Sequence, residues 1–154
     1  MSTPADTGPE HSLRLVRTIH APRQRVFDAW VKPELRKRWW RAAPEMFCDV
    51  CEVDARPGGR YRVNMKQPGP DAREYVTIGE FIEVVEPAKL VFTWRWESWR
   101  DSHEDARVTV ELRAVDAETT ELTLTHDKLP DANAAREHTE GWRGALDALV
   151  GWFS

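Results

Sequence analysis

The sequence predicts an α+β fold, in which a curved antiparallel sheet of about seven strands wraps around a long C-terminal helix. Two observations lead to this prediction. Residues 131–154 carry apolar side chains at three- and four-residue steps, as an amphipathic helix does. Between residues 47 and 126, apolar and polar side chains alternate instead, and turn signals recur at strand spacing. Strands joined by short turns form an antiparallel sheet, and the helix that follows covers its apolar face.

The composition is typical of one domain with one core. The chain has 154 residues, 41% of them hydrophobic, and a net charge of −4 with scattered basic residues. This distribution provides no basic face for nucleic acid. No apolar run approaches the roughly 20 residues of a membrane span, and the N-terminus lacks the apolar core of a signal peptide. We therefore expect a cytoplasmic protein, with residues 1–11 as a disordered tail and residues 12–154 as a single domain.

The first elements are a strand and two short helices. Residues 12–20 alternate in character and predict the strand. Pro22 then suits the first turn of a helix, and Pro33 ends that helix. Residues 34–40 predict a second short helix, whose tryptophans Trp39 and Trp40 face inward.

Six further strands are expected after residue 46. They are predicted at residues 47–54, 60–66, 74–85, 90–97, 107–113 and 122–126, and residues 98–105 form a charged loop that contains Trp99 and His103. The turn at residues 56–59 joins the first two of these strands, because Pro57 presets one dihedral angle and two glycines allow positive φ. Gly79 suggests a bulge in the longest strand.

The two cysteines, Cys48 and Cys51, form a CxxC motif. Because residues 47–54 alternate as a strand does, side chains three positions apart are expected on opposite faces, with alpha carbons about 10 Å apart. A disulfide requires less than about 7 Å. Zinc requires two further ligands, and the sequence has neither a second CxxC nor a paired histidine motif. The sequence therefore predicts neither a metal site nor a redox site, and it indicates no cofactor.

The eight tryptophans are the unusual feature of the composition. Phe92, Trp94 and Trp96 alternate on one strand and therefore share a face, and the C-terminal helix brings Trp142 opposite them. Such residues either fill a core or line an aromatic cavity. Three glycines in that helix, Gly141, Gly144 and Gly151, predict close backbone packing, because glycine inside a helix costs about 1 kcal/mol relative to alanine.

Several motifs in the same order resemble the family of activators of heat-shock-protein-ninety ATPase homologues, which belongs to the START-like, or SRPBCC, superfamily of helix-grip folds. These motifs are Ala21-Pro22, residues 26–30, Pro33-Glu34, Trp39-Trp40, residues 54–59, residues 79–81, Glu86-Pro87, residues 90–94, residues 120–126 and residues 138–142. The resemblance runs from about residue 13 to the end of the chain. It implies a cavity for an apolar small molecule between the sheet and the C-terminal helix. Some relatives are polyketide cyclases or sequester toxic natural products, and others activate a chaperone.

Three functions remain open at this stage. The first is non-enzymatic binding of a hydrophobic or aromatic molecule, such as a lipid or polyketide. The second is a chaperone-associated interaction module with an exposed apolar patch, for which Trp99 and the two short helices are the candidates, and the partner is a chaperone or a second copy of the chain in a homodimer. The third is a cofactor-free cyclase or dehydratase that uses His126 or His138, with Glu80 a third ionisable candidate if it faces inward. The expected ligand-binding residues are Tyr61, Met65, Phe92, Trp94, Trp96, His126, His138 and Trp142.

Overall fold

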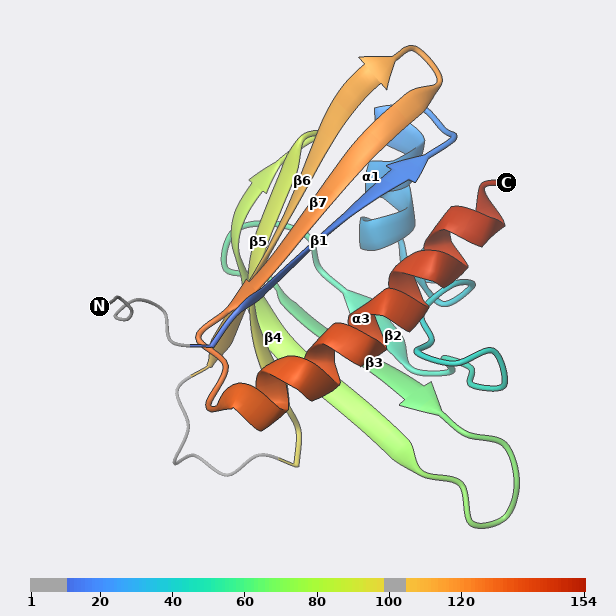
Figure 1. Ribbon diagram of the computed structural model, residues 1–154, viewed down its shortest axis with the longest axis vertical. Coiled ribbons are helices and arrows are strands. Elements are labelled where there is room, and N and C mark those ends of the chain that lie inside the picture. Colours follow the sequence, from blue (N-terminus) through green and yellow to red (C-terminus); the bar gives the residue numbers. More distant parts are fainter. Residues whose placement is uncertain (1–10, 99–104) are drawn as a thin grey trace.

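The computed structural model describes residues 11–98 and 105–154 and confirms the predicted order of elements (Figure 1). The elements are β1 (Leu13–Ile19), α1 (Arg23–Val31), α2 (Pro33–Arg36), β2 (Cys51–Val53), β3 (Arg60–Lys66), β4 (Glu74–Val85), β5 (Lys89–Trp96), β6 (Ala106–Asp116), β7 (Thr119–Asp127) and α3 (Ala132–Trp152). The predicted N-terminal tail, apart from His11, and the loop residues Trp99 and His103 lie outside the described residues.

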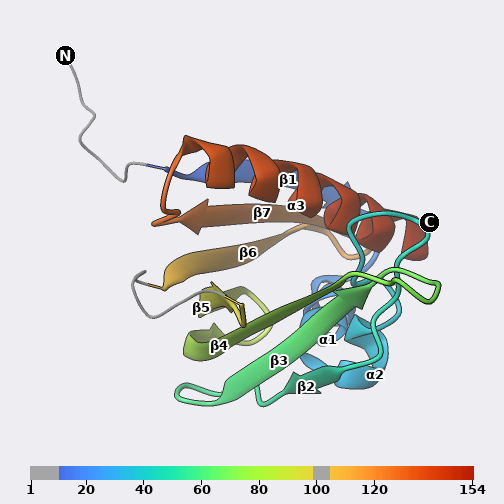
Figure 2. The same cartoon turned by 90° about the horizontal axis from the view of Figure 1, so that it is seen from below.

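The strands form one seven-stranded sheet in the order β1-β7-β6-β5-β4-β3-β2, and all neighbouring pairs are antiparallel. Figure 2 shows the sheet bent around its concave side, with α3 beside β1. Helix α1 packs against β6 and β7, and α2 packs against β2. This is the predicted α+β helix-grip arrangement. No helix in the described ranges is long and apolar enough to cross a membrane.

Helices α1 and α2 follow each other directly, because Pro33 ends the first helix and begins the second. Lys32, which precedes Pro33, has an extended backbone, as is usual before proline, so α1 ends there. The indole Nε1 of Trp39 then donates a hydrogen bond of 3.0 Å to the carbonyl of Ala29 in α1. Trp39 and Trp40 are fully buried as predicted, and they anchor the end of the helix pair in the core.

Helix α3 buries one face, as its periodicity predicts. The buried residues are His138, Trp142, Ala145, Leu146 and Leu149. The helix begins at Asp131, whose side chain accepts a hydrogen bond of 2.7 Å from the backbone N–H of Ala134 and so caps the first turn.

The close packing predicted for the three glycines of α3 occurs at Gly144, whereas the prediction is wrong at Gly141 and Gly151. A Cβ placed on Gly144 would lie 1.9 Å from the carbonyl oxygen of Ala42, so only glycine fits there. A Cβ on Gly141 would meet no atom within 4 Å. Gly141 instead borders a hollow in the molecule.

Gly79 has a packing role, and the bulge lies elsewhere. The register of β4 against β5 shifts between Phe81 and Glu83. At Gly79, a Cβ would lie 2.1 Å from the carbonyl oxygen of Thr93 and 2.5 Å from the ring of Tyr61, so the glycine makes room for that ring.

The regular strand predicted over residues 47–54 is also wrong, and the error changes the positions of the cysteines. Phe47 pairs with Lys66 and Cys51 pairs with Val63, so four steps along this segment match only three along β3. The extra residue makes a bulge, which reverses the alternation of side chains. Cys48 and Cys51 therefore lie on the same face of the sheet, together with buried Val63.

Candidate functional site

A cavity of about 960 Å³ lies between the sheet and α3. Its apolar wall comes from four segments of the chain: the segment between α2 and β2, strand β3, strand β5 and helix α3. The residues of this wall are Trp40, Met46, Met65, Trp94, Trp96 and Trp142. Its rim is polar and contains exposed side chains, among them Arg73, Glu74 and Glu137. A volume of this size falls within the range of about 300–1,000 Å³ that is typical of small-molecule sites.

Four of these tryptophans contact one another edge to face or at a tilt. The ring centroids of Trp94 and Trp142 are 5.1 Å apart, those of Trp40 and Trp142 are 5.3 Å apart, and those of Trp94 and Trp96 are 5.4 Å apart. Such geometries are favourable beyond the area that the rings bury. The cluster holds the cavity wall rigid, because each ring is fixed by at least one other.

The two histidines hold this aromatic wall in place through indole N–H groups. Trp142 Nε1 donates a hydrogen bond of 2.9 Å to Nδ1 of His126, and Trp96 Nε1 donates one of 2.9 Å to Nε2 of His138. Nδ1 of His138 lies 2.7 Å from the carbonyl oxygen of Ala134. Because ring nitrogens that accept from indoles carry no proton, both imidazoles are neutral in this arrangement.

Burial favours the same neutral state. Desolvation, together with the nearby charge that His138 carries when protonated, holds the pKa of His126 well below its usual value. Desolvation also lowers the pKa of His138, and its contact with the Ala134 carbonyl opposes that shift. The ring centroids of the two histidines are 5.0 Å apart. They form part of the wall that positions the tryptophans.

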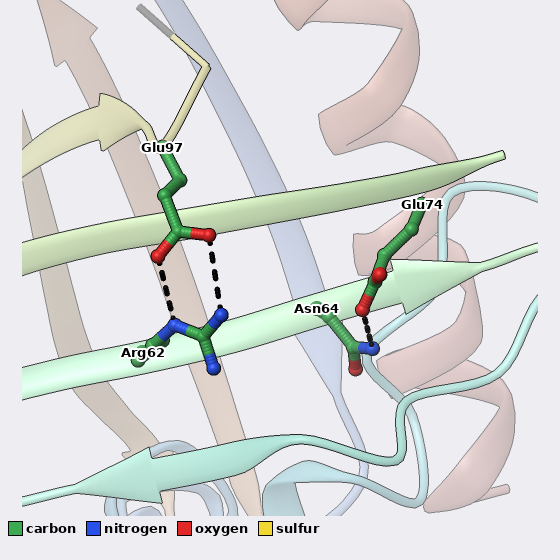
Figure 3. Close-up of polar contacts among 4 residues, drawn as sticks. All are labelled: Arg62, Asn64, Glu74 and Glu97. Atoms are coloured by element: carbon green, nitrogen blue, oxygen red, sulfur yellow. Dashed lines mark hydrogen bonds and ion pairs between the residues drawn. The ribbon is translucent and has the colours of Figure 1, made fainter.

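Two carboxylates on the rim are held by side chains of β3, as Figure 3 shows. Glu97 accepts hydrogen bonds of 2.9 and 3.1 Å from the guanidinium of Arg62, and this contact lowers the pKa of Glu97. Glu74 accepts one of 2.7 Å from Nδ2 of the buried Asn64. Both carboxylates border the cavity, so hydrogen-bonded polar groups line its mouth on this side.

The structure brings together most of the residues expected at the site. Met65, Trp94, Trp96, His138 and Trp142 line the cavity. His126 lies behind the wall and is fully buried, in contact with Trp94 and Trp142.

Tyr61 and Phe92 lie elsewhere in the core. They pack against each other with ring centroids 5.4 Å apart, and the hydroxyl of Tyr61 donates a hydrogen bond of 2.5 Å to the carbonyl of Thr93. Glu80 is exposed, so it does not join the histidines. Among the described residues, no group of three His, Cys, Asp or Glu side chains is placed to hold a metal ion.

Sequence reasoning missed Trp40 and Met46 as wall residues. Trp40 was expected inside the protein, but nothing in its local pattern shows which part of the core it reaches. Met46 stands in a segment without regular secondary structure, where no periodicity assigns a direction to its side chain. The only signal in the sequence was its high tryptophan content, with eight tryptophans among 154 residues.

A curved antiparallel sheet closed over a long C-terminal helix, with an apolar cavity between them, defines a START-like, helix-grip protein. The chain belongs to the family described as Activator of Hsp90 ATPase homolog 1-like protein, within the SRPBCC superfamily, since the family model matches residues 20–154.

Solved structures support the fold. A protein from Chromobacterium violaceum superposes with a TM-score of 0.80 at 24% identity, over 93% of this chain and 96% of that one. The AHSA1 protein from Silicibacter pomeroyi gives 0.77 at 21% identity, over 91% and 95%. An HSP90 activator from Plasmodium falciparum gives 0.69 at 21% identity, over 92% and 96%. A comparison with curated proteins finds no match.

Proposed function

We propose that this protein binds an apolar or aromatic small molecule in the cavity between the sheet and α3. The observation that carries the proposal is the cavity itself: about 960 Å³ of space remains beside a wall of tryptophan and methionine side chains. Close-packed protein cores leave few voids larger than a water molecule, so a cavity of this size is typical of a small-molecule binding site.

The distribution of polar groups supports the same occupant. Charged side chains stand at the rim, whereas the indole N–H groups of Trp96 and Trp142 donate to histidines. The indole nitrogens of Trp40 and Trp94 are buried and have no hydrogen-bond partner among the described residues. The wall therefore offers ring faces and thioethers to a ligand, and these favour planar or flexible apolar groups. Binding would place the ligand against Trp94 and Trp142.

The decisive variant is Gly141→Leu. No atom lies within 4 Å of a Cβ at this position, and the residue borders the cavity, so a leucine side chain would enter the hollow without displacing the helix. Gly151→Leu is the matched control: it makes the same change in the same helix, also with no atom within 4 Å of the Cβ, but away from the cavity.

We expect apolar dyes and aromatic polyketides to bind the wild type with micromolar Kd, which corresponds to about 8 kcal/mol, and to quench tryptophan emission. Gly141→Leu should weaken binding at least about tenfold, and Gly151→Leu should leave it unchanged. Fluorescence titration and ligand-induced shifts of Tm measure both. The proposal fails if no member of a broad apolar panel quenches emission or raises Tm, or if the two variants bind equally well.

The chaperone-interaction alternative rests on the family and on the likeness to an HSP90 activator at 21% identity. The exposed large apolar side chains of the described residues come from β1, the segment before β2, β4, β6 and α3. If the ligand panel fails, a pull-down with a purified chaperone of the heat-shock-protein-ninety class becomes the next measurement. A turnover assay on ligands that bind tests the cyclase or dehydratase alternative.

A further inference from the structure

Two hydrogen bonds between an indole and an imidazole connect α3 to the sheet. Nε1 of Trp96, in β5, donates to Nε2 of His138, in α3, at 2.9 Å. Nε1 of Trp142, in α3, donates to Nδ1 of His126, in β7, also at 2.9 Å. Helix α3 packs against β1, which lies three strands away from β5 in the sheet. The bond between Trp96 and His138 therefore links α3 to a distant strand, on the side of the sheet that borders the cavity.

The two histidines differ in their access to solvent. His138 lines the cavity and is 9% exposed, and its partner Trp96 lines the cavity as well. His126 is fully buried and lies outside the cavity lining. A proton can therefore reach His138 through the mouth of the cavity while the protein stays folded. To reach His126, a proton must pass through the closely packed core.

Protonation of His138 and its hydrogen bond to Trp96 exclude each other. An indole N–H can only donate, so Nε2 of His138 accepts and carries no proton. The proton of the neutral ring is then on Nδ1, which lies 2.7 Å from the carbonyl oxygen of Ala134 and donates to it. A second proton has to bind Nε2, where it would meet the indole N–H across 2.9 Å. Because the two N–H groups repel each other, the Trp96 indole must leave this position.

Other charged and titratable groups lie near His138. His126, from β7, has its ring centroid 5.0 Å from that of His138. The groups that share the cavity with His138 come from α3, its N-cap and the adjoining ends of β4 and β5: Arg73, Glu74, Tyr75, Glu97, Asp131 and Glu137. Burial lowers the pKa of His138, while the Ala134 carbonyl and Glu137 oppose that shift. His138 therefore takes up its proton below the ordinary value of 6.5.

We propose that His138 and Trp96 form a pH-sensitive switch, through which the cavity binds its apolar ligand at neutral pH and releases it in acid. Protonation of His138 breaks the hydrogen bond, frees the indole from the cavity wall and places an imidazolium beside the ligand. An apolar ligand would remove water from that charge, so ligand and proton compete for the cavity. This inference rests on the proposed function, because it describes how the same cavity is regulated.

The competition is reciprocal, since two linked binding equilibria alter each other by the same factor. Below the pKa of His138 in the free protein, the Kd of the ligand should therefore rise by up to about tenfold for each unit of pH. Well above that pKa, Kd should not depend on pH. His126 and Trp142 should keep their hydrogen bond over the range in which His138 titrates, because both are buried in the core.

The first experiment uses the ligand-free protein, so it tests the switch independently of any ligand. Nitrogen-15 NMR spectra follow the histidine ring nitrogens and the tryptophan indole N–H groups from pH 7.5 to pH 5. At pH 7.5, Nε2 of His138 should carry no proton. As the pH falls, the indole signal of Trp96 should shift with the midpoint of the His138 ring, and that of Trp142 should stay in place. A Trp96 signal that does not follow His138, or unfolding before His138 titrates, would overturn the proposal.

Trp96→Phe tests the coupling from the other side. Without the indole N–H, protonation breaks no hydrogen bond, so the midpoint of the His138 titration should rise by about half a pH unit or more. Trp152→Phe makes the same change at an exposed position of α3, outside the cavity lining, and should leave the midpoint where it is in the wild type. Equal midpoints in Trp96→Phe and the wild type would reject the role of the hydrogen bond.

The second experiment measures the Kd of Nile red, a neutral apolar dye, at pH 7.5 and pH 5. Kd should rise at least about threefold in the wild type and in His20→Gln, which changes an exposed histidine. In His138→Gln, Kd should not change with pH, because glutamine supplies an acceptor that does not titrate. A pH-independent Kd in the wild type, or the same rise in His138→Gln, would refute the switch. Failure of the dye to bind at either pH would count against the proposed function, and the spectra of the ligand-free protein would still decide on the switch.

Discussion

At the residue scale, the burial of Arg36 could not be predicted from its residue type. Arginine is among the residues least often buried, yet Arg36 lies under three indole rings, and its side chain makes a single hydrogen bond, at 3.0 Å, within residues 11–98 and 105–154. Removing a charge from water costs several kcal/mol, and cation–π contacts return only part of that. The indole rings around Arg36 therefore offset only part of the cost of burying its charge.

Replacement of Arg36 by methionine should therefore raise the free energy of unfolding, by about 1 kcal/mol or more, because an apolar chain of similar volume removes the desolvation cost. Arg38→Met, at an exposed position two residues along, is the control and should stay within about 0.5 kcal/mol of wild type. Denaturant unfolding followed by circular dichroism measures both. A loss of more than about 1 kcal/mol in Arg36→Met would show that the ring contacts outweigh the burial cost.

At the element scale, α3 combines two glycines with opposite surroundings. Gly144 presses against the backbone of Ala42, and Gly141 faces the cavity. The helix therefore approaches the segment after α2 closely at one turn and stands away from the sheet at the previous turn. This unequal spacing along one helix leaves the hollow open.

Alanine at these two positions should move stability in opposite directions. Gly141→Ala should raise the free energy of unfolding by up to about 1 kcal/mol, since it gains helix propensity and meets no atom. Gly144→Ala should lower it by about 1–3 kcal/mol, because its Cβ would fall 1.9 Å from the Ala42 carbonyl oxygen and the backbone must shift. Thermal or denaturant melts of the pair decide. Equal effects at both positions would refute the uneven packing.

At the scale of the whole molecule, the buried histidines link folding to pH. His126 and His138 are neutral in the folded protein, and their pKa values lie below the usual 6.5. The unfolded chain therefore binds protons that the folded chain excludes as the pH falls below about 6.5. The stability that these groups contribute is fully present above that pH and is lost as the pH falls towards their folded pKa values.

We expect His126 alone to cost about 1.5–2 kcal/mol of stability between pH 6.5 and pH 5. His126→Gln keeps an acceptor for the Trp142 indole and removes the titration, so its stability profile should be flatter over this range. His20→Gln, at an exposed histidine, is the control and should retain the wild-type slope. Unfolding by urea at half-unit steps of pH gives the slopes. A wild-type profile that is flat below pH 6.5 would contradict the neutral, buried state of His126.

The sequence by itself determined the elements and their class. Alternation in β5 and the three- and four-residue steps in α3 are local patterns, and each reports which side of its own element is buried. Short turns between the strands then imply antiparallel neighbours, and a long helix at the end has one sheet face to cover. For these reasons the fold, the inward face of α3 and five of the cavity-lining residues could be predicted from the chain alone.

Only the tertiary structure decided how the elements approach one another. One inserted residue before β2 brought Cys48 and Cys51 to one face, and Asn64, fourteen positions beyond Val50, stabilises that bulge. Whether Gly141 or Gly144 meets the backbone depends on the path of a segment about a hundred residues earlier. The distance between two packed segments depends on the size of every side chain that lies between them. A local pattern of apolar residues does not contain this information.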